Sequence, residues 1–348
     1  MLIINNKRKN ERYNMNIKKI GLTALAASLV SVSAHAGALT ASGSASMNME
    51  GHSGEGLNKG STFSMANSVT LAGSGELDNG LTVSVSFELD QGNASGSQTA
   101  NQTTSDGAVF DNHSVNVSSD TLGSLTLAAH GGNSSTTAID TTAAGDLWDN
   151  FDQLANSAGV TFADMAIGSG GRNNNLYYVS PELGMGITVT ASYEPQGGTA
   201  ESATSYGVNY TGVEGLTLNY AIADEETGTA STSGDNTVMK ASYAYGPLTV
   251  TYSNMDHDEG LSSGANDNEI TSYAVSYTVT DELSVTYGTE ESDLGSATVD
   301  AETDGITVAY TTGGMTITAV MAEIENGNHA TNTAADAEYW KLGASFAF

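Results

Sequence analysis

The chain has 348 residues, of which 40 are acidic and 10 are basic, and its formal net charge at pH 7 is −30. This balance excludes nucleic-acid binding, because neutralising phosphates requires clusters of lysine and arginine. A hydrophobic fraction of 39% and a mean hydropathy of −0.19 exclude a bundle of membrane helices, and the absence of cysteine excludes disulfides and thiolate metal sites.

Residues 1–36 have the pattern of a presequence with a secretory signal peptide. A basic start at Lys18 and Lys19 precedes an apolar stretch over residues 20–32, and the small-residue motif Ala-His-Ala ends at Ala36. We expect cleavage after Ala36. Residues 1–14 add nothing that an export signal needs, which favours Met15 as the true start.

One local pattern recurs through residues 37–348: a tight turn, and then alternation of apolar and small polar residues. The turns are centred near residues 79, 122, 184, 214, 246, 281 and 313. After the first of them, for example, Leu81 and Val83 alternate with Thr82 and Ser84. A period of two predicts extended strands with one apolar and one polar face.

Seven turns imply fourteen strands, and the segment from about Ala38 to Met49 and the closing segment from Tyr339 add one strand at each end. The short turns alternate with longer polar connections, which is the layout of an outer-membrane barrel whose apolar face meets lipid. Residues 37–348 are therefore predicted to form an all-β, 16-stranded antiparallel transmembrane β-barrel.

Tyrosines stand at the far ends of several apolar faces and predict an aromatic girdle at the lipid interface. The alternative is that they reflect ordinary strand propensity. The set is Tyr193, Tyr220, Tyr252, Tyr287 and Tyr310.

The longest connection, the third of the long loops, lies between His130 and Arg172 and carries Asp146, Asp149 and Asp152. The residues alone leave two alternatives open. The loop is either an exposed acidic loop or it folds back into the lumen.

Two stretches of the sequence resemble known patterns. "NNNLYYVSPELGMGITVTASYE" follows the third long loop, and "KLGASFAF" ends the sequence. Both are similar to the trimeric general porins of Gram-negative outer membranes. The second resembles the assembly signal of outer-membrane barrels, carried here by Lys341, Gly343, Phe346 and Phe348.

This resemblance implies a homotrimer with the third loop folded into the lumen. It also implies outer-membrane lipid, lipopolysaccharide and the barrel-assembly machinery as partners. In the family, loop acids face a cluster of arginines on the opposite wall. Residues 37–348 hold 39 acidic residues and only four basic ones, namely Lys59, Arg172, Lys240 and Lys341, so this chain departs from that pattern.

Alternation turns Lys240, Lys341, Glu88, Glu194 and Glu290 towards the lumen and leaves Arg172 ambiguous. An acid-dominated pore favours cations. The predicted pore-lining set is Asp146, Asp149, Asp152, Glu88, Glu194, Glu290, Lys240, Lys341 and Arg172.

These features predict an outer-membrane channel for passive diffusion of small hydrophilic solutes and ions, with a cation preference and no cofactor. One alternative is a secreted β-solenoid adhesin rich in glycine, serine and threonine, although such a protein needs no terminal aromatic residue. A second is a substrate-selective barrel transporter, for which an aromatic track along the lumen is expected.

Catalysis and specific metal binding are not predicted. Asn112, His113 and Ser114 are residue types used by a barrel hydrolase, but neighbours on one strand point to opposite faces and cannot form a triad. The acidic stretches "NMDHDEG" and "IADEETG" lack the ligand ladder of a calcium loop.

Overall fold

The structure is a computed structural model that describes residues 39–91, 110–152, 154, 157–158, 160, 162, 173–195, 202–225, 234–259, 264 and 266–348. The presequence and Arg172 lie outside the described residues. In chain order, the strands are β1 (Thr40–Gly54), β2 (Ser61–Glu76), β3 (Thr82–Gln91), β4 (His113–Ser119), β5 (Gly123–His130), β6 (Asn175–Val179), β7 (Ile187–Glu194), β8 (Ala203–Tyr210), β9 (Leu216–Glu225), β10 (Gly234–Tyr245), β11 (Leu248–Asp258), β12 (Asn268–Thr278), β13 (Leu283–Leu294), β14 (Ala301–Thr312), β15 (Met315–Glu325) and β16 (Ala337–Ala347). Three short 3-10 helices are η1 (Leu147–Phe151), η2 (Gly327–His329) and η3 (Thr333–Ala335).

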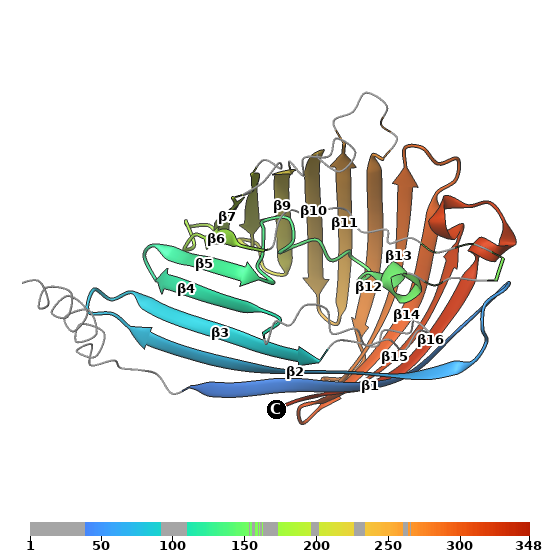
Figure 1. Cartoon of the computed structure of the whole chain (residues 1–348), viewed down its shortest axis with the longest axis horizontal. Coiled ribbons are helices and arrows are strands. Elements are labelled where there is room, and N and C mark those ends of the chain that lie inside the picture. Colours follow the sequence, from blue (N-terminus) through green and yellow to red (C-terminus); the bar gives the residue numbers. More distant parts are fainter. Residues whose placement is uncertain are drawn as a thin grey trace, which may run out of the picture.

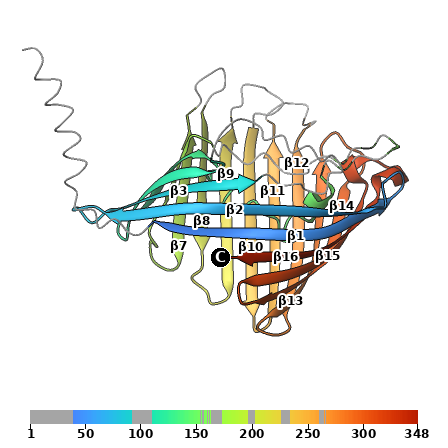
Figure 2. The same cartoon turned by 60° about the horizontal axis from the view of Figure 1, so that its bottom comes forward.

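The strands form one closed antiparallel barrel in which each strand pairs with its neighbours in sequence and β1 pairs with β16 (Figures 1 and 2). The predicted 16-stranded fold is confirmed, and all seven predicted turns join consecutive strands on one rim. The longer connections lie on the other rim. Among the described residues, no helix has the length and apolar character needed to span a membrane.

The two faces of the wall differ in polarity over its middle part. Large apolar side chains on the outer face are exposed, such as Phe63 at 80% and Met321 at 71%. The inner face carries small hydroxyl residues, among them Ser205, Ser253 and Ser272, which are buried. This is the reverse of a soluble barrel, and it is the arrangement of a wall between hydrocarbon and a polar lumen.

Aromatic side chains form two rows on the outer face. The row nearer the long loops is Tyr193, Tyr206, Tyr220, Tyr252, Tyr273, Tyr287 and Trp340, and the row nearer the short turns is Tyr243, Tyr245, Tyr277, Tyr310 and Phe346. Tyr310 was predicted to lie at the end of its strand far from the short turns, and this prediction was wrong. Tyr310 lies near the short turns, because it pairs with Leu283, the first residue of β13. Two rows on opposite sides of an apolar band are typical of membrane barrels.

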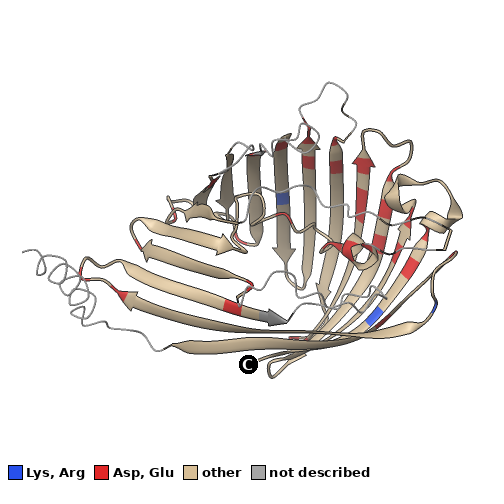
Figure 3. Cartoon of the chain, in the orientation of Figure 1, with Lys and Arg blue, Asp and Glu red and all other residues tan. Residues whose placement is uncertain are grey.

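Between the aromatic row nearer the long loops and the long loops themselves, the polarity of the two faces of the wall is reversed. Here the outward positions are carboxylates and inward positions such as Val238, Ile270 and Ile324 are apolar and buried. We name these carboxylates the acidic belt, and Figure 3 shows acidic residues at the long-loop ends of these strands. The belt comprises Asp224, Asp235, Asp256, Asp258, Glu269, Glu291, Asp293, Glu302, Asp304, Glu323, Glu325 and Glu338. The inversion marks where the outer surface leaves hydrocarbon.

Turn glycines on the short-turn rim offer a test of this architecture. Gly215 and Gly80 both have left-handed backbones, with φ of 77° and 80°. A Cβ at Gly80 meets open space, whereas a Cβ at Gly215 collides with the carbonyl oxygen of Ala244 on β10. Left-handed geometry alone costs an L-residue about 1–2 kcal/mol.

We therefore predict that Gly215→Ala lowers the free energy of unfolding more than Gly80→Ala does, by at least about 1 kcal/mol. Urea unfolding of the protein in lipid vesicles measures both variants. Equal losses would contradict the turn geometry at Gly215.

Candidate functional site

The segment between β5 and β6, which we call loop three, lies along the inner face of the wall. Its backbone N–H groups donate to inward serines on three strands: Ser135 N to Ser205 Oγ (2.7 Å), Ala143 N to Ser253 Oγ (2.8 Å) and Ala144 N to Ser272 Oγ (3.0 Å). In Figure 1 this segment crosses in front of β9–β13, inside the barrel. Loop three therefore takes its partners from the inner faces of β8, β11 and β12.

Glycines on the inner face allow loop three to approach the wall closely. A Cβ added at Gly288 on β13 would collide with Ala144 of the loop, at 2.5 Å from its Cβ and 2.9 Å from its Cα. At Gly207 on β8, an added Cβ would lie 2.6 Å from Thr190 Oγ1 and 3.1 Å from Ser135 Cβ. Both glycines occupy inward positions of their strands, where a larger side chain would keep loop three away from the wall.

Glu290 on β13 holds the middle of loop three. Its carboxylate accepts hydrogen bonds from the Leu147 and Trp148 N–H groups, each at 3.0 Å, and from the Thr142 hydroxyl. The two N–H groups open η1, where the helix itself offers no acceptor. Bonds to a carboxylate are among the stronger hydrogen bonds in proteins.

The prediction that Glu290 lines the pore needs correction. Its side chain is only 1% exposed, because loop three covers it. Alternation correctly predicted that Glu290 faces inward, but it carried no information about loop three, which packs on the inner face. Glu290 is an anchor for loop three and adds no solvent-facing charge to the wall.

The part of loop three that contains η1 is fixed at the seam between β1 and β16. Phe151 of η1 packs edge-on against Tyr339 of β16, with ring centroids 6.1 Å apart. His52 of β1 bonds through Nε2 to the Asn150 carbonyl oxygen at 2.8 Å, and the Tyr339 hydroxyl donates to Glu50 at 2.6 Å. An apolar cluster formed by loop three, the β1–β2 connection and inward wall residues surrounds these contacts. It includes Trp148, Phe151, Phe162, Leu57, Val238, Met255, Ile270, Val320, Ala322 and Ile324.

Two predicted charges meet at loop three. Lys240 Nζ on β10 donates to the Thr141 carbonyl oxygen at 2.7 Å, and it interacts electrostatically with Asp146 and Asp140. Asp146 also accepts a hydrogen bond from the Thr142 N–H at 2.8 Å. The Lys240 charge is therefore compensated by neighbouring oxygens.

The other predicted lumen residues are spread over the barrel. In loop three, Asp149 is exposed and Asp152 is half-buried. Glu88 accepts from the Asn112 side chain at 2.6 Å beside β3, and Glu194 is the last residue of β7. Lys341 is half-buried and lies across from Glu50 on β1.

The wall opposite loop three, formed by the inner faces of β1–β5, is hydrophilic and mostly uncharged. Apart from Glu50, His52, Glu76, Glu88 and Lys341 at the adjoining β16, its described side chains are small and most of them are polar. They include Ser44, Ser46, Asn48, Ser64, Ser68, Thr70, Ser84, Ser86, Ser114, Asn116 and Thr126. Such a surface provides hydrogen bonds to water without an ordered charge array.

The residues of the proposed assembly signal lie at the seam. The Phe348 backbone exchanges hydrogen bonds with Gly43 at 2.8 and 3.0 Å, which extends the β1–β16 ladder to the last residue. Phe346 and Phe348 are exposed on the outer face, whereas Gly343 is buried under the Asn48 amide. These positions describe the folded state and leave recognition by the assembly machinery as a prediction.

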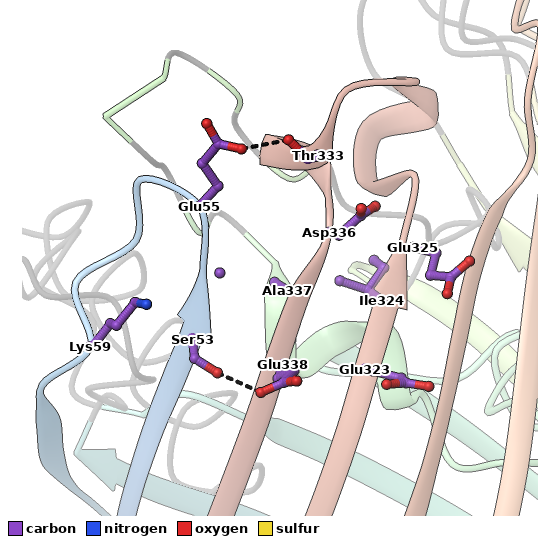
Figure 4. Close-up of a pocket in the computed structure, with 11 residues that line it drawn as sticks. Ser53, Glu55, Lys59, Glu323, Ile324, Glu325, Thr333, Asp336, Ala337 and Glu338 are labelled. Atoms are coloured by element: carbon purple, nitrogen blue, oxygen red, sulfur yellow. Dashed lines mark hydrogen bonds between the residues drawn. The ribbon is translucent and has the colours of Figure 1, made fainter.

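An acidic pocket of about 400 Å³ opens at the long-loop rim beside the seam (Figure 4). Glu55, Glu323, Glu325, Asp336 and Glu338 line it with a single lysine, Lys59. The Ser53 hydroxyl donates to Glu338 at 2.7 Å. Five carboxylates against one lysine give the pocket a negative potential. Among the described residues, no group of His, Cys, Asp and Glu side chains has the arrangement of a metal site.

Comparison with known proteins agrees with this architecture. A closed 16-stranded barrel with a polar lumen defines a channel of the porin type, and the family model described as "Gram-negative porin" matches residues 21–348. The chain belongs to the Gram-negative porin family, which places it in the outer membrane. Members of this family are passive channels and not enzymes.

Solved porin structures share the fold at low sequence identity. An anion-selective porin from Comamonas acidovorans is 17% identical, with 90% of this chain and 100% of that chain covered and a TM-score of 0.60. A mutant of the Rh. blastica porin is 14% identical, with 89% and 100% covered and a TM-score of 0.60. A porin refined at 1.8 Å resolution is 16% identical, with the same coverage and TM-score. A comparison with curated protein sequences finds no match.

The anchor at Glu290 can be tested against its neighbour on the strand. In Glu290→Gln the side chain keeps its shape, but the amide offers one acceptor oxygen to three donors, which costs about 3 kcal/mol of loop docking. We expect frequent conductance fluctuations in single-channel recordings as loop three leaves the wall. Glu291→Gln removes the same charge from the outer face and should leave the recordings steady. Fluctuations in both variants, or in neither, would contradict the anchor.

Proposed function

We propose that this porin lets small hydrophilic solutes and ions diffuse passively through a water-filled lumen, and that cations pass more readily than anions. The observation that carries the cation preference is the imbalance of exposed charge along the path. Asp149 of loop three is exposed, and Glu55 and Asp336 of the acidic pocket lie at the rim outside the acidic belt. Acid-lined pores favour cations.

The lysines do little to offset this imbalance. Lys240 is engaged by the Thr141 carbonyl oxygen and lies near Asp140 and Asp146. Lys59 is surrounded by acids at the rim, and Lys341 lies across from Glu50. The Comamonas porin is described as anion-selective, and a shared fold at 17% identity carries no selectivity from one chain to the other.

Reversal potentials in a planar bilayer under a KCl gradient test the preference. We expect the sign that corresponds to faster permeation of K⁺. Asp149→Asn, in the exposed part of loop three, should move the reversal potential towards zero. Glu302→Gln, an equal change of charge in the acidic belt, should not. A preference for Cl⁻ in the unmodified protein would overturn the proposal.

We further propose that the acidic belt faces lipopolysaccharide and that accumulated cations screen it. The belt holds carboxylates directly across from one another on neighbouring strands, as in Asp235 and Asp258 or Glu302 and Glu325. Like charges so placed repel, and a surface with this potential concentrates counter-cations.

A homotrimer is the proposed assembly, since porins of this family are generally trimeric. The outer faces support β1–β5 as the contact surface. Within these strands the outward positions carry neither tyrosine nor carboxylate, and instead carry residues such as Met47, Phe63, Met65 and Leu89. Strands β9–β16, by contrast, all carry the belt, and all of them except β15 contribute to the aromatic rows.

Substitution by lysine distinguishes the proposed contact surface on β1–β5 from the surface that faces lipid. Met65→Lys puts an unpaired charge on the proposed contact surface and should yield monomers in detergent. Val275→Lys, on the outer face of β12, costs about 2–4 kcal/mol in a bilayer but should leave the trimer intact. The mass of the detergent-solubilised particle measures both. A monomeric unmodified protein would overturn the proposed assembly.

A further inference from the structure

A cavity of about 270 Å³ lies in the lumen between the start of loop three and the inner faces of β6–β9. Tyr177 and Val179 of β6, Thr188 and Thr190 of β7, and Asn209 and Asn219 of β8 and β9 line it from the wall, and Ser135, Ala138 and Ile139 line it from the loop. Ser205 on β8 is hydrogen-bonded to loop three, and Gly207 and Asn209 are the next two inward positions of β8 towards its short turn. The cavity therefore lies on the short-turn side of loop three.

None of the described side chains that line this cavity carries a charge. In a chain of net charge −30, such a site selects against ions. A charged solute would lose hydration there without gaining a partner of opposite charge. The occupant that fits is therefore neutral.

The polar groups of the cavity suit hydroxyl groups. Asn209 and Asn219 are direct cross-strand neighbours, and the Asn209 amide donates to the Asn219 carbonyl oxygen. The pair leaves one carbonyl oxygen and one amino group for a ligand, whichever of the two amides donates. A hydroxyl group both donates and accepts, so it satisfies both.

The remaining polar groups are occupied or fix the geometry. The Tyr177 hydroxyl is hydrogen-bonded to the Thr190 side chain, and Thr190 donates to Ser135 Oγ at 2.8 Å. This chain of bonds holds the Tyr177 ring and the start of loop three in place. Ile139, Val179 and the tyrosine ring supply apolar surface, against which the C–H face of a sugar ring packs.

We infer that this cavity is a binding site for neutral polyhydroxylated solutes of about the size of one sugar ring. Its volume is near the lower limit of small-molecule pockets, about 300 Å³, which excludes a longer saccharide. A solute held briefly beside the water-filled path is concentrated within the channel. The inference rests on the proposed function, since the solute reaches the cavity through the lumen.

The test measures D-glucose binding in two ways on the trimer or monomer as purified. Single-channel recordings in KCl detect glucose as added current noise, and saturation-transfer NMR of the detergent-solubilised protein detects binding without any channel measurement. The double variant Asn209→Leu with Asn219→Leu keeps the side-chain volume and removes the donor and acceptor. Asn116→Leu, which changes a lumen-facing asparagine of β4, is the matched control.

We expect both signals in the unmodified protein and in Asn116→Leu. In the double variant the apparent affinity should fall about tenfold, the effect of losing one or two hydrogen bonds, while the KCl conductance stays unchanged. A glycol ether of similar size without hydroxyl groups should give neither signal.

Three results would overturn the inference: no glucose signal by either method, equal affinity in the double variant and the unmodified protein, or an equal response to the glycol ether. Normal KCl conductance together with any of these leaves the proposed channel function standing. Absence of KCl conductance would overturn the proposed function instead, and the NMR measurement would still decide whether the cavity binds glucose. The heat-modifiable gel mobility of folded barrels verifies that each variant has folded.

Discussion

A wall inside a bilayer must satisfy every backbone N–H and C=O group within itself, because hydrocarbon offers no hydrogen-bond partner. This constraint makes the contact between β1 and β16 the decisive one in this molecule, since without it two edges would face lipid. The ladder of that contact runs from Ser44 with Ala347 to Gly54 with Ala337, and Phe348 extends it to Gly43. All other features depend on a closed wall.

The seam that closes the wall also fixes the lumen. On its inner face, Tyr339 contacts Glu50 and His52. His52 also bonds to Asn150 of loop three, and Tyr339 packs against Phe151 of the same loop. The middle of the loop is held by Glu290 and the start by Ser205. A loop tied to strands on both sides of the seam has a defined path only when the barrel is closed, so closure of the wall and shape of the lumen are coupled.

Alternation predicted the strands and turns because lipid imposes a strong and local rule on each outward position. The rule no longer applies where the wall leaves hydrocarbon, and there the sequence predicted neither the ends of the strands nor their inward partners. β1 continues five residues past the expected end near Met49, because Gly51 and Ser53 pair with β16 without any apolar signal. At that level the inward residues Ile270 and Ile324 are apolar, because the surface they pack against is loop three. The partners of loop three, Glu290 among them, depend on contacts between residues far apart in sequence, and no local pattern encodes these.

The inversion of polarity also changes what the net charge means. Much of the acidic excess of residues 37–348 lies in the belt, on the far side of the wall from the lumen, where we propose that it faces lipopolysaccharide and cations. Charges outside the wall act on a permeating ion only through that wall and through screening solution, which attenuates fields over about 10 Å at moderate salt. Among the described residues, few charged groups remain that could set selectivity, such as Asp149 of loop three, Glu55 at the rim beside the seam, and lysines already engaged by oxygens. In a porin with a strongly acidic sequence and a largely uncharged wall at β1–β9, the proposed cation preference and the proposed binding of neutral solutes at the asparagine pair therefore use different parts of the lumen.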